Sequence, residues 1–256
     1  MLSRLLKFLI IFGAFIFLMK KCGYHQGCHR FSFLNGTTIH GEGNTTKQTR
    51  DVGAFTKLSL GSSADVEIVQ GPTRSVVVET YPNIMEYIET VVEDGTLKIR
   101  QKDNTSLNFS ENNGLKIYIT NPTYEEIHVR GSGNIVANSK INSPEINISV
   151  TGSGDAKFSD LVTTKSKINI TGSGNITIDN GNADNLDISV VGSGDAHLIN
   201  FPTKIVSAHV AGSGNLSCNA TEKYDLHVTG SGDIRYKKTN AIVNSHSSGS
   251  GTIEAE

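Results

Sequence analysis

The sequence predicts an all-β fold: a right-handed parallel β-helix, or solenoid, with coils of about 20 residues and an irregular N-terminal cap. Two observations carry this prediction. The triplet Gly-Ser-Gly occurs seven times in the second half of the chain, at spacings of 18 to 21 residues. Apolar residues also recur at even distances from each triplet, which is the period of strands that bury one face. Strands that repeat in one direction must be parallel, and parallel connections are almost always right-handed.

The triplets mark one turn in each coil. They begin at Gly131, Gly152, Gly172, Gly192, Gly212, Gly230 and Gly249. Glycine is expected there because it tolerates a positive φ angle. The predicted structural turn glycines are Gly131, Gly133, Gly152, Gly154, Gly172, Gly174, Gly192, Gly194, Gly212, Gly214, Gly230 and Gly232.

Apolar residues stand two and four positions before the first six triplets, and four and six positions after the first glycine of all seven. Around Gly152, these positions are Ile148, Val150, Ala156 and Phe158. Such alternation predicts two short strands per coil, with one side of each strand in the core. A propeller blade needs about 40 residues, so the repeat is too short for that fold.

The first residues predict export. A run of twelve apolar residues, 8–19, follows Arg4 and Lys7 and precedes Lys20 and Lys21. This length suits a signal peptide and is short for a membrane span. We therefore assign residues 1–21 to a signal peptide or an N-terminal membrane anchor, and expect a cell-envelope protein, periplasmic or at the cell surface. Cleavage, lipidation at Cys22 and retention of the segment remain open.

The next segment, 22–50, is predicted to be a linker, whose end could form a frayed first strand. Cys22 and Cys28 could form a disulfide or stay unpaired, and their spacing with His25 and His29 matches no standard zinc pattern. The third cysteine, Cys218, falls at an inward position, where we expect it to act as a small hydrophobe.

We assign residues 51–256 to one β-helical domain. Residues 51–120 alternate apolar and polar residues without the triplets, which predicts irregular coils that cap the solenoid. A short helical turn is expected within residues 83–90. Residues 121–256 carry the Gly-Ser-Gly repeats.

Several motifs together resemble the head GIN domain of putative auto-transporter adhesins. They are F-T-K-L-S-L-G-S-S-A-D-V-E-I-V-Q-G at 55–71, D-G-T-L-K-I at 94–99, L-K-I-Y-I-T-N-P at 115–122 and the G-S-G-[ND] series, which ends in G-S-G-D-I-R-Y at 230–236. The similarity runs from about residue 51 to the C-terminus. It implies a β-helical fold and a surface-associated role such as adhesion, and it carries no catalytic residues.

The residue after each triplet alternates between Asn and Asp before a final Thr. The row is Asn134, Asp155, Asn175, Asp195, Asn215, Asp233 and Thr252. Both residue types stabilise turns, and interposed Asn limits repulsion between carboxylates. Calcium binding is the alternative. Carboxylates about 10 Å apart cannot share an ion whose ligands lie near 2.4 Å, but calcium could still use one Asp with neighbouring backbone carbonyls.

A second row lies three positions before each triplet and is predicted to face outward. It contains His128, His209, His227 and His246. The last three should stand on consecutive coils, so His209, His227 and His246 form a candidate metal-binding ladder. Solvated surface histidines are the alternative interpretation.

The sequence predicts a non-enzymatic binding module with no cofactor. Gly-Ser-Gly is not the G-x-S-x-G nucleophile elbow, which requires partner His and acid residues. The formal net charge of −2 offers no basic surface for nucleic acid. We expect a surface protein or a glycan as the partner, with membrane contact only through the N-terminal segment. A structural spacer and a glycan-active enzyme, using an acid such as Asp155 or Asp195, are the alternatives.

Overall fold

The computed structural model describes residues 37–256, except 104 and 110–113. The predicted signal peptide or anchor, Cys22 and Cys28 lie outside the described residues. Among the residues that are described, no helix has the length and apolar character needed to cross a membrane. In the N-terminal part, the elements are β1 (Thr37–His40), β2 (Thr46–Arg50), β3 (Lys57–Gly61), β4 (Asp65–Gln70), β5 (Ser75–Thr80), the 3-10 helix η1 (Met85–Tyr87), β6 (Ile88–Glu93), β7 (Thr96–Gln101), β8 (Thr105–Asn108) and β9 (Leu115–Asn121).

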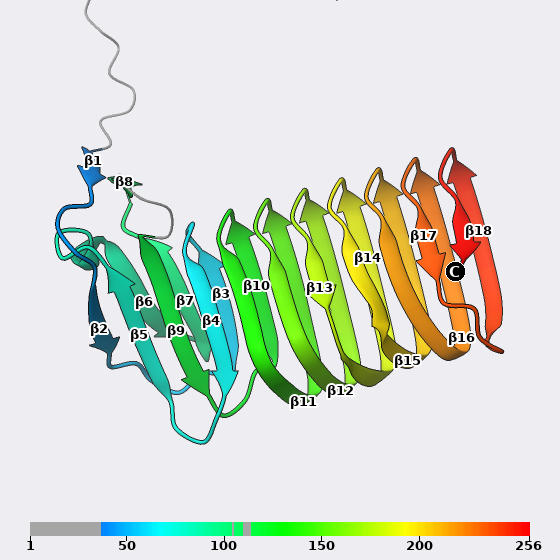
Figure 1. Cartoon of the computed structure of the whole chain (residues 1–256), viewed down its shortest axis with the longest axis horizontal. Coiled ribbons are helices and arrows are strands. Elements are labelled where there is room, and N and C mark those ends of the chain that lie inside the picture. Colours follow the sequence, from blue (N-terminus) through cyan, green and yellow to red (C-terminus); the bar gives the residue numbers. More distant parts are fainter. Residues whose placement is uncertain (1–36, 104, 110–113) are drawn as a thin grey trace, which may run out of the picture. The chain divides into compact units, whose positions relative to one another are not determined.

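The part of the chain after β9 is a stack of parallel coils (Figure 1). Its strands are β10 (Glu126–Gly131), β11 (Asn134–Gly152), β12 (Ala156–Gly172), β13 (Ile176–Ile178), β14 (Gly181–Gly192), β15 (Ala196–Gly212), β16 (Leu216–Gly230), β17 (Ile234–Tyr236), β18 (Ile242–Gly249) and β19 (Ile253–Ala255). Each triplet aligns with the next, since Gly131 pairs with Gly152 and Gly152 with Gly172. The predicted β-helix is confirmed.

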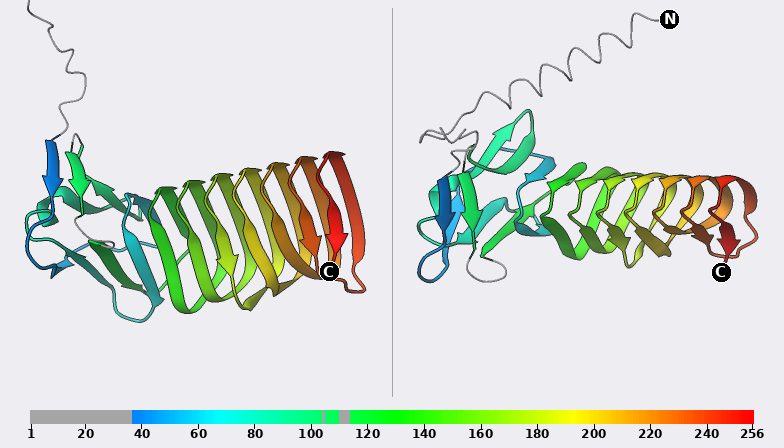
Figure 2. Two further views of the ribbon diagram at one scale, coloured as in Figure 1. Left: turned by 45° about the horizontal axis from the view of Figure 1, so that its top comes forward. Right: turned by 90° about the horizontal axis from the view of Figure 1, so that it is seen from above.

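Each coil has two strand segments that form opposite faces of the solenoid. The pre-triplet face consists of the segments that lead into the triplets, in register with β10, and it continues into β3 and β7. The post-triplet face consists of the segments that follow the triplets, in register with β13, and it continues into β4 and β9. Figure 2 shows the two faces edge-on along the stack.

The core lies between these faces. Ile148, Val150, Ala156 and Phe158 are at most 1% exposed, and the equivalent residues of neighbouring coils are buried in the same way. Burial of branched side chains removes apolar surface from water, which is the main driving force for stacking one coil on the next. Cys218 is buried among them as predicted, and burial raises the pKa of its thiol to about 12.

The N-terminal cap departs from the order of the chain. The rung made of β3 and β4 lies between the rung of β7 and β9 and the first regular coil, because β3 pairs in parallel with both β7 and β10. Beyond the rung of β7 and β9 the pairing becomes antiparallel: β5 pairs with β9, β2 with β5, and β6 with β7. The region expected to form irregular coils is thus partly an antiparallel sheet, which ends the parallel stack.

The segment expected to be a linker contributes two strands. β1 pairs with β8, and β2 pairs with β5. The side chains of Thr46–Thr49 are exposed, so β2 contributes backbone hydrogen bonds more than apolar burial. Alternation of apolar residues is the signal that identifies a strand in a sequence, and β2 lacks it.

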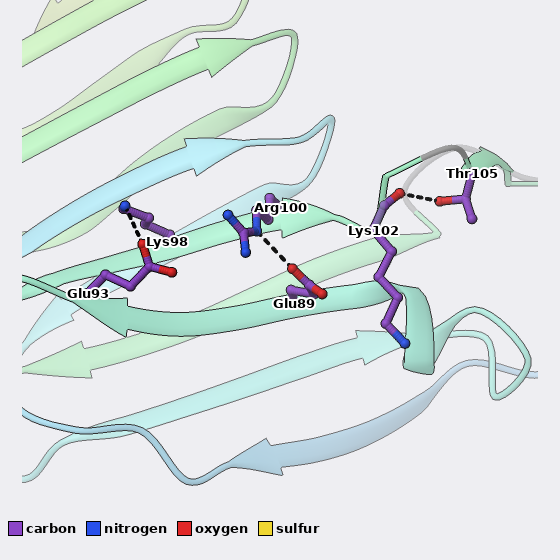
Figure 3. A network of polar contacts seen from close by, with 6 residues as sticks. All are labelled: Glu89, Glu93, Lys98, Arg100, Lys102 and Thr105. Atoms are coloured by element: carbon purple, nitrogen blue, oxygen red, sulfur yellow. Dashed lines mark hydrogen bonds and ion pairs between the residues drawn. The ribbon is translucent and has the colours of Figure 1, made fainter. Parts of the chain in front are cut away.

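Cross-strand ion pairs cover the hairpin of β6 and β7 (Figure 3). Lys98 Nζ lies 2.6 Å from Glu93 Oε2, and Arg100 Nε lies 2.8 Å from Glu89 Oε2. The hydrogen bond from Lys98 lowers the pKa of Glu93. Exposed pairs add little stability, but charged side chains keep other strands from joining an edge. The helical turn expected within residues 83–90 is present as η1.

Candidate functional site

The triplet turns are built so that backbone approaches backbone. The first glycine of each triplet has φ between 119° and 125°, a region that side chains avoid. The second glycine faces the preceding coil, where a Cβ on Gly174 would lie 2.0 Å from the carbonyl oxygen of Gly154. The carbonyl of Gly152 accepts hydrogen bonds from the N–H groups of Ser173 and Gly174, at 2.8 and 3.0 Å. A Cβ on the first glycine would also clash, since that of Gly172 would lie 2.5 Å from the carbonyl oxygen of Gly152. Both glycines thus allow close approach, and the first also needs its positive φ.

Gly181, outside the triplets, likewise combines a positive φ with a close approach to the backbone of the preceding coil. Its φ is 122°, and an added Cβ would lie 1.8 Å from the carbonyl oxygen of Leu161. Only the pair Asn180-Gly181, a common turn sequence, signals it.

The Asn/Asp row forms one continuous hydrogen-bonded ladder. The Oδ1 atom of each member accepts the backbone N–H of the next: Asn175 N lies 2.8 Å from Asp155 Oδ1, and Asp195 N lies 2.9 Å from Asn175 Oδ1. The amide of Asn175 also donates to Asp155 Oδ1 at 2.9 Å. The ladder continues into the cap, where Asn134 donates to Asp65 at 2.8 Å.

This geometry explains the alternation. An Asn can donate to the carboxylate of the coil before it, whereas a carboxylate has no proton to donate. At the last step, the backbone N–H and hydroxyl of Thr252 both donate to Asp233 Oδ1, at 2.8 and 2.9 Å. These bonds favour the ionised form and lower the pKa of Asp233. The row has a structural role in the turn, because the Oδ1 atom of each Asn and Asp accepts a hydrogen bond from the next coil.

Replacing Asn175 by Asp tests this role. The variant places carboxylates on three consecutive coils and removes the donor to Asp155, so we expect a loss of about 1 to 2 kcal/mol of unfolding free energy at pH 7. Thermal unfolding followed by circular dichroism measures it. The control, Asp195→Asn, keeps the acceptor and removes a charge, and its expected change is within about 0.5 kcal/mol. Equal stability of the two variants would contradict the ladder.

The histidine row lies in register on the pre-triplet face. His209 pairs with His227 and His227 with His246, and all three side chains are exposed. The rings of His227 and His246 are 6.4 Å apart between centroids, and His227 Nε2 lies 3.0 Å from Asp225 Oδ1. Over the described residues, no three His, Cys, Asp or Glu side chains converge as metal ligands. The metal-binding ladder therefore stays a prediction.

A groove crosses the coils along one margin of the pre-triplet face. It consists of two adjoining hollows of about 340 and 370 Å³ that share Glu145 and Asn147. The first reaches back to Lys57 of β3, and the second reaches forward to Ser207 of β15. At about 4.8 Å per strand, the six strands from β3 to β15 span about 24 Å.

The groove walls are charged and change sign along their length. Glu125, Glu126 and Glu145 line the first hollow together with Lys57, whose Nζ lies 3.4 Å from Glu126 Oε2. His128 also contacts Glu126. The contact with His128 lowers the pKa of Glu126 most, with a further contribution from Lys57.

The second hollow is lined by Lys165, Lys167 and Asp187, and by the buried Ser166. Ser166 is in register with Ile146 and Leu186, so a shorter side chain stands where its neighbours carry long apolar ones. Sequence reasoning missed the groove, because its walls are outward residues that come together only when coils stack. A serine at an inward offset is the one available signal.

Comparisons with known proteins agree with this architecture. The family model described as "Putative auto-transporter adhesin, head GIN domain" matches residues 54–240. Among solved structures, a putative adhesin from Bacteroides fragilis has a TM-score of 0.80 at 24% identity, covering 85% of this chain and 100% of that one. A putative lipid binding protein from Parabacteroides distasonis (TM-score 0.70, 24% identity) covers 86% of this chain and 100% of its own.

A putative adhesin from Parabacteroides merdae has a TM-score of 0.70 at 21% identity, with 86% of this chain and 99% of that chain covered. These likenesses support the fold. No match was found among curated proteins.

Proposed function

Because the chain belongs to the family of head GIN domains of putative auto-transporter adhesins, we propose that it is an exported, non-enzymatic binding module of the cell envelope. Its ligand is an extended surface protein or a glycan chain, which lies across the coils in the pre-triplet groove. The apolar segment 8–19 delivers the domain out of the cytoplasm, as a signal peptide or as an anchor.

The single observation that carries this proposal is that the two hollows of the groove adjoin at Glu145 and Asn147. Together they reach across six strands, so one extended chain can contact several coils at once. Each contact is weak in an exposed, polar groove, but contacts repeated along one chain add up if the ligand stays extended. The walls carry both carboxylates and lysines, which suits a ligand with several polar groups more than one with a single charge.

Binding to purified matrix proteins and long glycans on an array tests the proposal. The full chain is compared with a Lys165→Glu/Lys167→Glu variant, which reverses the charge of the second hollow. We expect saturable binding by the wild type and a loss of about tenfold or more in the variant, equal to about 1.4 kcal/mol. Lys140→Glu is the control, because Lys140 is an exposed lysine of β11 that lines none of these hollows.

Two results would count against the groove. Unchanged affinity of the double variant would place the ligand elsewhere. A folded wild type that saturates with no probe would favour a structural spacer, for which the regular stack of coils is the supporting observation.

A further inference from the structure

A hollow of the post-triplet face lies where the cap meets the first regular coils. Its volume is about 580 Å³, within the range of small-molecule sites. It is lined by residues of β4, β9, β11 and β12, among them Tyr118, Val136 and Glu67. Register explains this grouping: Tyr118 stands opposite Glu67, and Glu67 opposite Val136, on three adjacent strands.

The Tyr118 ring is held in place from the side of the cap. Its hydroxyl donates to Glu79 Oε2 at 2.9 Å, and Lys47 Nζ lies 4.8 Å from the ring centroid and 3.5 Å from Glu79 Oε2. The strand order is β2, β5, β9, β4, β11, so Lys47 and Glu79 come from the side away from the hollow. Lys47 thus covers one face of the ring, while Tyr118 itself is part of the lining of the hollow.

The rim supplies polar groups at the spacing of the strands. Asp65 and Glu67 alternate along β4 on the outward side, and Asn138 Nδ2 lies 3.4 Å from Glu67 Oε1. The charged lining groups are Asp65, Glu67, Asp155, Lys116 and Lys157, so the net charge is close to −1. Lys157 is also paired with Asp179, at 3.1 Å. A nearly neutral lining does not favour a strongly charged ligand such as a phosphate ester.

We propose that this hollow binds a neutral saccharide unit, with Tyr118 and Val136 under the apolar face of the sugar ring and Glu67, Asp65 and Asn138 bonding its hydroxyl groups. An aromatic face fits the C–H side of a pyranose, and carboxylate and amide oxygens accept from hydroxyl groups. The site is on the opposite face from the groove and is independent of it. Tyr118 comes from the irregular region of the chain and not from the Gly-Ser-Gly repeats.

A glycan array tests the site: the full chain is offered neutral, sialylated and sulfated glycans. The neutral oligosaccharide that binds most strongly is then titrated by saturation-transfer NMR. We expect saturable binding of a neutral glycan with millimolar or lower Kd, and a loss of about tenfold or more in Tyr118→Ala. Tyr118→Phe should bind within about twofold of the wild type, since the lost hydroxyl already serves Glu79. Glu67→Gln, which preserves shape, should weaken binding even if Tyr118→Ala proves unstable.

Three results would overturn the proposal. In the first, a folded wild type does not saturate with any neutral glycan up to ~10 mM. In the second, Tyr118→Ala or Glu67→Gln binds as strongly as the wild type. In the third, the wild type binds the anionic glycans more strongly than the neutral ones. The Lys165→Glu/Lys167→Glu variant should bind the same oligosaccharide normally, which separates this site from the groove.

Discussion

Replacing Gly174 by alanine is expected to lower the free energy of unfolding by about 4 kcal/mol or more, a loss at the extreme of single substitutions. The added methyl group would lie 2.0 Å from the carbonyl oxygen of Gly154 and 2.6 Å from Cγ1 of Val150. Neither neighbour can move freely, because Gly154 is held by its own turn and Val150 is packed in the core. The coils must therefore separate at this point.

Guanidinium unfolding followed by far-ultraviolet circular dichroism measures this loss. A stack of coils can unfold in segments, so the transition should broaden as well as shift. Ser173→Ala is the control within the same turn, since the Ser173 side chain is exposed and its expected effect is within about 0.5 kcal/mol. A Gly174→Ala variant as stable as this control would show that backbone contact between turns does not hold the stack.

Replacing Phe158 by alanine is expected to cost about 3 to 5 kcal/mol. Phe158 is fully buried and stands in register between Ala137 and Ile178, so it fills space that the small Ala137 leaves open. Truncation leaves a cavity that a stack fixed by backbone ladders on both sides cannot easily close. The shift in thermal midpoint, followed by circular dichroism, reports the loss.

Phe158→Leu is the comparison that separates cavity formation from a general response to mutation. Leucine keeps most of the apolar volume, so its expected cost is below about 2 kcal/mol. If the two substitutions reduced stability equally, the core around Phe158 would be more adaptable than its burial indicates.

The predictability of the fold follows the regularity of the chain. In the repeats, every coil packs against a neighbour that has the same pattern of apolar and polar residues, so the local alternation and the packing agree. The alternation around Gly152 therefore identified buried residues correctly. The cap has no such agreement. β3 precedes β7 in the chain but lies between β7 and β10 in space, and β4 lies in the same way between β9 and β11. No local pattern specifies that order.

The candidate sites divide in the same way. The register of His209, His227 and His246 could be deduced from spacing alone, and the structure shows it. The first step of the Asn/Asp ladder, from Asn134 to Asp65, could not, since Asp65 follows a turn without the triplet. The groove and the hollow over Tyr118 depend on side chains from strands far apart in the sequence.

By itself, the sequence determined the solenoid, its period, its buried positions and its turns, because a repeat brings each residue beside its own equivalent one coil away. Only the tertiary structure decided how the cap interleaves with the first coils and where the surface is hollowed. Those features depend on contacts between unlike segments, such as Tyr118 of β9 beside Glu67 of β4 and Val136 of β11. Nonrepeating contacts leave no period in the sequence from which they could be inferred.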